Sequence, residues 1–221
     1  MNFYSEKETL YFSRPRYDLI KLLPNNPNNK ILELGSGGGD TLIEIKNRKL
    51  ASEVAGIELV EIPGSNQSNK LIDKFIIANV EQTTLLLLEA HYDIILIGDV
   101  LEHLENPWQT VTNLSSYLKP GGIFIASVPN IRFFTAMYKI YVKGDFGYKE
   151  SGLFDKTHLR FFCKKNIIQL FTKPFLKIEN IIPVESVRDD KPYWSTINKI
   201  TFRIFEELLT VQYIITAKKI R

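Results

Sequence analysis

Residues 30–40, KILELGSGGGD, place a short apolar run directly before a loop of glycines. The run at 31–34 is typical of a strand buried in a parallel sheet. Residues 41–49 continue as an amphipathic helix. Glycines between a strand and a helix allow positive φ angles and let a ligand approach the backbone. The helix that follows presents unpaired N–H groups at its start. The stretch therefore predicts a strand, a loop and a helix that together hold a ligand.

Apolar runs alternate with amphipathic stretches along much of the chain. We expect further strands at 54–59, 75–78, 92–97, 123–128, 176–182 and 211–217. We expect further helices at 19–23, 101–117, 164–171 and 196–209. Residues 84–90 are expected to form a helix or a turn, and 119–122 (KPGG) a turn. The alternation predicts an α/β fold in which right-handed crossovers join parallel strands.

A single domain over residues 1–221 is the simplest organisation of this chain. Residues 1–29 would form its N-terminal helical segment. Residues 130–163 are rich in aromatic side chains, contain three glycines and lack a clean period. We expect this stretch to be a substrate-side insertion or lid, partly helical and partly loop, whose aromatic residues serve packing rather than a substrate box.

The charges around the glycine loop indicate the kind of ligand. A dinucleotide-binding loop has glycine at its first, third and sixth positions, but the sixth position counted from Gly35 is Asp40. Asp40 and Glu33 would oppose a pyrophosphate, whereas they suit an ammonium or a sulfonium. S-adenosylmethionine (SAM) carries both cations, and its carboxylate suits a helix N-terminus. Glu58 would accept hydrogen bonds from ribose hydroxyls, as it would in a nicotinamide dinucleotide site; a solvated strand-end charge is the alternative.

Five ordered segments resemble the class I SAM-dependent methyltransferases. They are ILELGSGGGD (31–40), GIELVE (56–61), ANVEQ (78–82), YDIILIGDVLEHLENPW (92–108) and LKPGGIFIASVPN (118–130), and they cover most of residues 30–130. The resemblance implies a Rossmann-like, seven-stranded, mostly parallel sheet with helices on both faces. It also implies that the last strand, 211–217, is antiparallel and that the aromatic-rich insertion follows the fifth strand.

The same resemblance implies which residues bind SAM. They are Glu33, Gly35, Ser36 and Gly37 for the methionine part, Glu58 and Leu59 for the ribose, Asn79 and Val80 for the adenine, and Asp99 and Val100 near the methyl group. The family often has aspartate where Asn79 stands. An amide is a weaker acceptor than a carboxylate, so Val80 would supply the backbone contact to the adenine.

Two further likenesses concern the acceptor. DVLEHL (99–104) and KPGG resemble the subgroup that methylates small molecules, the ubiquinone-biosynthesis-like and sugar-modifying enzymes. GYKESGLFDKTHLRFF (147–162) resembles a segment of methyltransferases from bacterial polysaccharide and glycan gene clusters. That likeness would place four polar residues over the mouth of the site: Asp155, Thr157, His158 and Arg160. We therefore expect transfer of a methyl group to a hydroxyl of a sugar or glycan precursor.

An oxygen acceptor must lose a proton, and a base with a pKa near neutrality removes it best. His103, one helical turn beyond Asp99, and His158 are the candidate catalytic bases, with a structural hydrogen bond as the alternative for each. His91 precedes the strand at 92–97 and would lie at the opposite end of the sheet. No metal ligands are expected.

Composition bears on the remaining function classes. The net charge is only +3, from 28 basic and 25 acidic residues, so there is no clustered basic face of the kind that binds nucleic acid. No apolar run approaches the ~20 residues of a membrane span. The single cysteine, Cys163, allows no intrachain disulfide and is expected to pack in the core. We expect a cytoplasmic protein acting on a small molecule, and a homodimer is compatible with the sequence. A non-catalytic SAM-binding protein and a nicotinamide-dependent oxidoreductase remain as alternatives.

Overall fold

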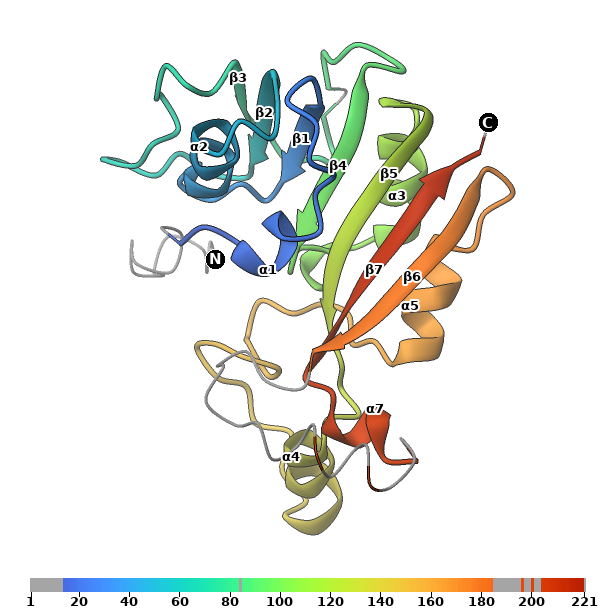
Figure 1. The fold of residues 1–221 in the computed structure, drawn as a ribbon. Coiled ribbons are helices and arrows are strands. Elements are labelled where there is room, and N and C mark those ends of the chain that lie inside the picture. Colours follow the sequence, from blue (N-terminus) through green and yellow to red (C-terminus); the bar gives the residue numbers. More distant parts are fainter. Residues whose placement is uncertain (1–13, 84, 185–195, 197–199, 201–203, 221) are drawn as a thin grey trace.

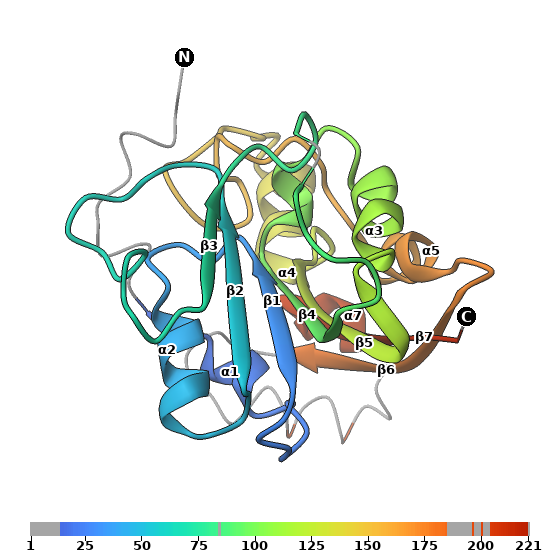
Figure 2. The same cartoon turned by 90° about the horizontal axis from the view of Figure 1, so that it is seen from above.

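One seven-stranded sheet forms the centre of the molecule (Figures 1 and 2). The computed structural model describes residues 14–83, 85–184, 196, 200 and 204–220. The strands are β1 (Lys30–Leu34), β2 (Glu53–Glu58), β3 (Lys74–Ile77), β4 (Tyr92–Gly98), β5 (Leu118–Pro129), β6 (Leu176–Val184) and β7 (Gln212–Lys219). Their order is β3-β2-β1-β4-β5-β7-β6. Among these strands, β7 alone runs against the others, pairing antiparallel with β5 and β6. The predicted sheet with its antiparallel last strand is confirmed.

Helices cover both faces of the sheet, as predicted (Figure 2). They are α1 (Tyr17–Ile20), α2 (Asp40–Asn47), α3 (Pro107–Ser115), α4 (Phe134–Met137), α5 (Lys164–Phe171) and α7 (Glu206–Leu209), with a 3-10 turn, η3 (Leu101–His103), and a π-helical turn, η4 (Tyr138–Val142). Successive side chains of a strand point to opposite faces. Ile95 and Ile97 of β4 therefore pack with α3 and α5, whereas Ile94 and Leu96 pack with α1 and α2.

The KPGG segment differs from its prediction. Residues 119–122 belong to β5 instead of forming a separate turn. The pairing register between β4 and β5 shifts there, because Tyr92 pairs with Leu118 but Ile94 pairs with Ile123. The extra residues bulge outward, and Gly121 takes a φ of +83° that suits glycine. Proline and glycine thus mark a bulge inside the strand.

Three other predicted segments can be compared with the structure. Residues 85–90 contain a turn at 89–90 and no helix, and residue 84 lies outside the described residues. Six of the fourteen residues of the helix predicted at 196–209 also lie outside them; residues 196 and 200 are helical, and the described end of the segment is α7. The helix predicted at 101–117 is divided as its proline suggested. Pro107 stands at the start of α3, where Asn106 accepts a hydrogen bond from the Gln109 N–H at 3.1 Å.

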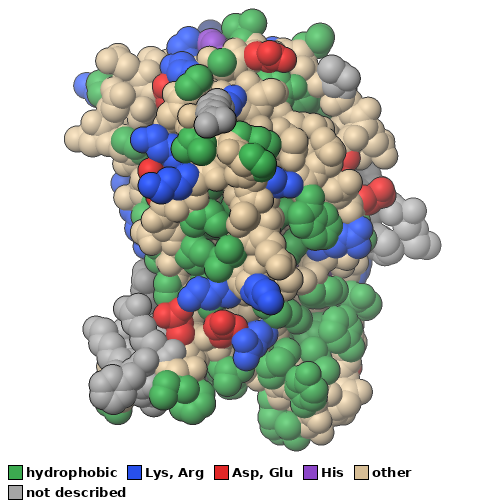
Figure 3. Space-filling model, turned by 90° about the vertical axis from the view of Figure 1, so that its right-hand side faces the viewer, with side chains coloured by type: hydrophobic (Ala, Val, Ile, Leu, Met, Phe, Trp, Pro, Cys, Tyr) green, Lys and Arg blue, Asp and Glu red, His purple; other side chains and the backbone are tan. Residues whose placement is uncertain are grey.

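The insertion at 130–163 lies beyond the carboxyl ends of the parallel strands (Figure 1). It is partly helical, through α4 and η4, and otherwise loop, as predicted. Phe154 and Phe162 are buried, but Tyr141 and Tyr148 are exposed. Figure 3 shows apolar side chains gathered on the surface at this end of the molecule. The aromatic residues therefore serve packing only in part.

Among the described residues, no helix has the length and apolarity that crossing a bilayer requires.

Candidate functional site

A cavity of about 790 Å³ opens at the carboxyl edge of the sheet. The ends of β1, β2, β3 and β4 form its wall together with the N-terminal segment around α1. All ten residues expected to bind the cofactor line this one cavity: Glu33, Gly35, Ser36, Gly37, Glu58, Leu59, Asn79, Val80, Asp99 and Val100. His103 lines it as well, whereas His158 does not. Crevices outside the carboxyl ends of strands are the usual ligand sites of such sheets.

The glycine loop brings backbone against the cavity without intervening side chains. Gly35 and Gly37 have φ angles of +72° and +51°, which glycine adopts without strain. The N–H groups of Gly35 and Ser36 both donate to the Ile57 carbonyl, at 2.9 and 3.1 Å. A Cβ on Gly35 would lie 2.2 Å from Cγ2 of Val100. The loop is therefore anchored to β2 at a fixed distance from the end of β4.

Glu33 is the main unsatisfied group of the site. Its side chain is buried, and its Oε2 has no hydrogen-bond partner. Burial raises the pKa of Glu33 to about 8, although the Thr41 hydroxyl and Arg16 act to lower it. A buried carboxyl oxygen without a partner is costly, and a cationic donor entering the cavity would satisfy Oε2.

Glu58 holds the loop from the neighbouring strand. Its Oε2 accepts from the Gly37 N–H at 2.8 Å and its Oε1 accepts from the Leu59 N–H at 2.7 Å. Burial raises the pKa of Glu58 in spite of these bonds. Gln67, which sequence reasoning missed, donates to the Gly37 carbonyl at 2.9 Å. Each Glu58 oxygen retains a second lone pair, so the carboxylate can still accept from a ligand hydroxyl.

Asn79 and Val80 lie past the end of β3, on the far wall of the cavity. The Asn79 side-chain oxygen accepts from the Glu81 N–H at 2.9 Å. This local turn uses one lone pair of the amide oxygen and fixes the side chain. The position is thus ordered before any ligand arrives.

Asp99 ends β4 in the left-handed region, at a φ of +54°. Its Oδ1 accepts from the Ser127 hydroxyl at 2.6 Å, and its Oδ2 accepts from Arg16 Nη1 at 3.0 Å. Aspartate enters this region more readily than most residues, and the two bonds hold it there. After this turn, Val100 and His103 line the cavity.

Arg16 is a site residue that sequence reasoning missed. Its guanidinium also donates to both carboxylate oxygens of Asp18, at 2.9 and 2.8 Å. Burial lowers the pKa of Arg16. The nearby carboxylates of Asp99 and Asp18 raise it by more, so the pKa lies above its usual value. Gly98 makes room for this side chain, because a Cβ there would lie 2.7 Å from Arg16 Nη1. No local sequence signal links residue 16 to residue 99; the contact depends on how the N-terminal segment packs.

The histidines are placed partly as expected. His91 pairs with Glu53 at 2.8 Å, at the end of the sheet opposite the cavity. His103 lines the cavity, and the ring of His158 lies behind it, 4.7 Å away between centroids. Glu102, beside His103, is fully buried, and burial and Asp99 hold its pKa well above its usual value.

The polar residues of 147–162 do not line the cavity, so their expected position over its mouth stays a prediction. Asp155 accepts from the N–H and the hydroxyl of Thr157, at 2.9 and 2.7 Å. Arg160 donates to the Glu105 carbonyl. These contacts shape the loop, and two of its residues, Thr157 and His158, approach the site through His103. Cys163 is half-buried at the start of α5, where burial raises its pKa.

The chain is similar in sequence to known methyltransferases. A family model described as "Methyltransferase domain" matches residues 9–174. The ubiquinone biosynthesis O-methyltransferase of Rickettsia typhi is 33% identical over 117 residues, 50% of this chain and 46% of that protein. The chain thus spans about half the length of the Rickettsia relatives it matches.

Solved structures share the fold at low identity. A SAM-dependent methyltransferase from Mesorhizobium loti superposes with a TM-score of 0.62 at 15% identity, covering 91% of this chain and 96% of that one. A Burkholderia thailandensis N1-methyltransferase, solved with S-adenosylhomocysteine, gives 0.60 at 14%, covering 100% and 82%. From its matched domain and its sheet order, the chain belongs to the class I SAM-dependent methyltransferase family.

Proposed function

We propose that this chain binds SAM in the cavity and transfers its methyl group to a hydroxyl of a small molecule. The observation that carries the proposal is the buried Glu33 carboxyl, whose Oε2 has no partner in a cavity bounded by the glycine loop. A cationic ammonium satisfies this group, whereas a pyrophosphate would be repelled by it. The family of the chain and the cavity therefore support the same ligand.

Each group of residues in the cavity would bind one part of SAM. Glu33 would bind the ammonium, and the glycine loop would lie against the methionine part. Glu58 would accept from the ribose hydroxyls, and Asn79 and Val80 would flank the adenine. Asp99 would then lie near the reacting methyl group. Each of these side chains is already held by hydrogen bonds or packing, which keeps the cost of ordering the site low.

Methyl transfer from SAM forms a C–O bond to the acceptor as the C–S bond breaks, releasing S-adenosylhomocysteine and the proton of the hydroxyl. The chain contributes chiefly by holding both reactants in line. His103 marks the end of the cavity where a proton can be taken up, and His158 supports it from behind. We expect His158→Ala to lower turnover on an oxygen acceptor while leaving SAM affinity nearly unchanged.

The acceptor is proposed from two sources. The segment at 147–162 favours a sugar or glycan-precursor hydroxyl. The Rickettsia typhi relative is named an O-methyltransferase of ubiquinone biosynthesis. Hydroxyl oxygen is common to both, and this shared chemistry is the core of the proposal.

Two measurements test the proposal. Calorimetry should show that S-adenosylhomocysteine binds with a stoichiometry of one and that NAD does not bind. A screen with methyl-labelled SAM, covering nucleotide sugars and phenols, should transfer label to an oxygen acceptor. Binding of NAD in preference to S-adenosylhomocysteine would overturn the cofactor assignment. Cofactor binding with no transfer to any hydroxyl compound would instead support a non-catalytic SAM-binding protein.

A further inference from the structure

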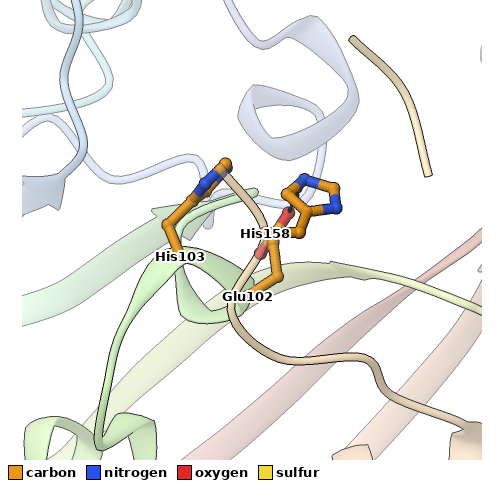
Figure 4. A group of neighbouring side chains, drawn as sticks. All are labelled: Glu102, His103 and His158. Atoms are coloured by element: carbon orange, nitrogen blue, oxygen red, sulfur yellow. Dashed lines mark ion pairs between the residues drawn. The ribbon is translucent and has the colours of Figure 1, made fainter. Parts of the chain in front are cut away.

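Glu102, His103 and His158 form a cluster beside the cavity (Figure 4). Glu102 and His103 belong to η3, directly after β4, and His158 comes from the insertion. Figure 4 shows the two rings facing the Glu102 side chain. One ligand atom from each residue lies within 4.8 Å of the others, and His158 Nε2 is 4.0 Å from Glu102 Oε1. Segments distant in the sequence thus converge on one small volume.

The Glu102 carboxyl makes one long contact, between its Oε1 and His158 Nε2 at 4.0 Å. The side chain is 1% exposed, and neither carboxylate oxygen has a hydrogen-bond partner. The backbone anchors the insertion here instead, because the Glu102 carbonyl accepts from the N–H groups of Leu159 and Arg160, at 2.8 and 2.9 Å. A fully buried carboxyl group whose two oxygens accept no hydrogen bond is a ready ligand for a cation.

The hydrogen bonds of the two rings fix the nitrogen that each presents. His103 Nδ1 lies 3.0 Å from the Thr157 carbonyl, which can only accept, so Nδ1 carries the hydrogen. The Thr157 hydroxyl gives its own hydrogen to Asp155 and accepts from Nδ1 as well. His158 Nδ1 likewise lies 3.2 Å from the Leu153 carbonyl. In a neutral ring this leaves the lone pair on Nε2. Donation of the other ring N–H to a carbonyl is the usual support of a metal-binding histidine.

We propose that Glu102, His103 and His158 bind a divalent transition-metal ion, with Zn²⁺ as the best match. Two imidazole nitrogens and one carboxylate form the donor set of known three-ligand zinc and iron(II) sites. Bond lengths of about 2.1 Å put tetrahedral ligand atoms roughly 3.4 Å apart. Side-chain rotations that move the atoms by about 1 Å from their present separations would close the site.

Three protein ligands leave at least one coordination position open. Since His103 lines the cavity, the ion would lie at the cavity's end. Its use there rests on the proposed function: with His103 bound to the ion, a hydroxyl coordinated to the ion would have a lowered pKa and would lose its proton to water, instead of to His103, before the oxygen attacks the methyl group. The binding site itself does not depend on that use.

Competition of the purified protein with a chromophoric chelator measures Zn²⁺ binding without reference to activity. Co²⁺ should give the visible absorption of a tetrahedral or five-coordinate site. We expect one ion per chain, and a loss of affinity of 10-fold or more in His158→Ala and in Glu102→Gln. His91→Ala is the matched control, because His91 pairs with Glu53 at the opposite end of the sheet. It should bind Zn²⁺ as the wild type does.

Circular dichroism and S-adenosylhomocysteine affinity show whether each variant is folded. Should Glu102→Gln fail to fold, His158→Ala decides alone, since its side chain lies on a loop of the insertion. Wild-type protein that binds no Zn²⁺ stoichiometrically, or variants that bind it as well as wild type, would overturn the metal site. In that case His103 would act as a metal-free base, and intact SAM binding would leave the proposed function standing.

Discussion

At the scale of single residues, Glu33 decides what the cavity can hold. Glu33→Gln keeps the shape and removes the capacity for charge. Hydrogen bonds to charged groups contribute about 1.5–3 kcal/mol, so we expect affinity for S-adenosylhomocysteine to fall by about 10- to 100-fold in a calorimetric titration. Thermal stability without ligand should change little. Glu44→Gln is the control, since Glu44 forms an exposed pair with Arg48. Equal affinities of wild type and Glu33→Gln would remove Glu33 from the ligand site.

The pKa of Glu33 has a consequence for binding. Burial raises this pKa to about 8, with Arg16 lowering it and Glu58 and Asp40 raising it. Between about pH 4.5 and 8, the folded chain keeps a proton that the unfolded chain has lost, so this group's contribution to stability declines as pH rises.

A bound ammonium favours the ionised carboxylate, so cofactor binding below pH 8 should release the proton. Calorimetry at pH 6.5 in phosphate and in Tris should give different binding enthalpies. With one proton released, they should differ by the difference between the ionisation enthalpies of the two buffers. The difference should vanish in Glu33→Gln. Identical enthalpies in both buffers at pH 6.5 would show that Glu33 is already ionised.

Gly35 is the tightest point of the glycine loop. Gly35→Ala combines a positive φ with a Cβ only 2.2 Å from Val100, so we expect lost cofactor binding and a destabilisation of about 2–4 kcal/mol in urea unfolding. Gly64→Ala is matched, because Gly64 has a φ of +74° but no atom within 4 Å of its Cβ position. It should cost about 1 kcal/mol. Adding Val100→Ala to Gly35→Ala should restore part of the stability, and no restoration would mean that the clash is not the cause.

At the scale of elements, Arg16 joins the N-terminal segment to the ends of β4 and β5. It donates to Asp99 and to the Ser127 hydroxyl, at 3.0 and 2.9 Å. Arg16→Met retains the apolar stem but leaves these acceptors unpaired. The pair is partly exposed, so we expect a loss of about 1–3 kcal/mol of unfolding free energy. Arg48→Gln, on the surface of the same face, should stay within about 0.5 kcal/mol. A loss no larger for Arg16 than for Arg48 would show that the N-terminal segment is held by packing alone.

The elements themselves were largely predictable, because they depend on local patterns. The run at 92–97 could only be a buried strand, and α5 began and ended where its apolar spacing indicated. KPGG was misassigned because proline and glycine mark both turns and bulges, and only the pairing of β4 with β5 distinguishes them. The convergence of Glu102 with His158, like the reach of Arg16 to Asp99, arises from packing between distant segments. No periodicity records such contacts, and the sequence indicated no metal ligands.

At the scale of the whole molecule, the cavity joins the ends of four strands to the N-terminal segment. Unfolding must therefore disperse the ligand site together with the sheet. A ligand that binds only the folded chain stabilises it by about 2.7 kcal/mol when present at 100 times its Kd. For a chain of 221 residues, each kcal/mol raises Tm by about 2–4 °C.

We therefore expect saturating S-adenosylhomocysteine to raise Tm by about 5–10 °C in differential scanning calorimetry. NAD at the same concentration should give no shift, because Glu33, which lines the cavity, opposes its pyrophosphate. Glu33→Gln should need a higher ligand concentration for the same rise, whereas Glu44→Gln should follow the wild type. The shift in Tm thus compares the binding of the two cofactors to the same protein. A larger shift with NAD than with S-adenosylhomocysteine would mean that the charges around the glycine loop do not select the ligand.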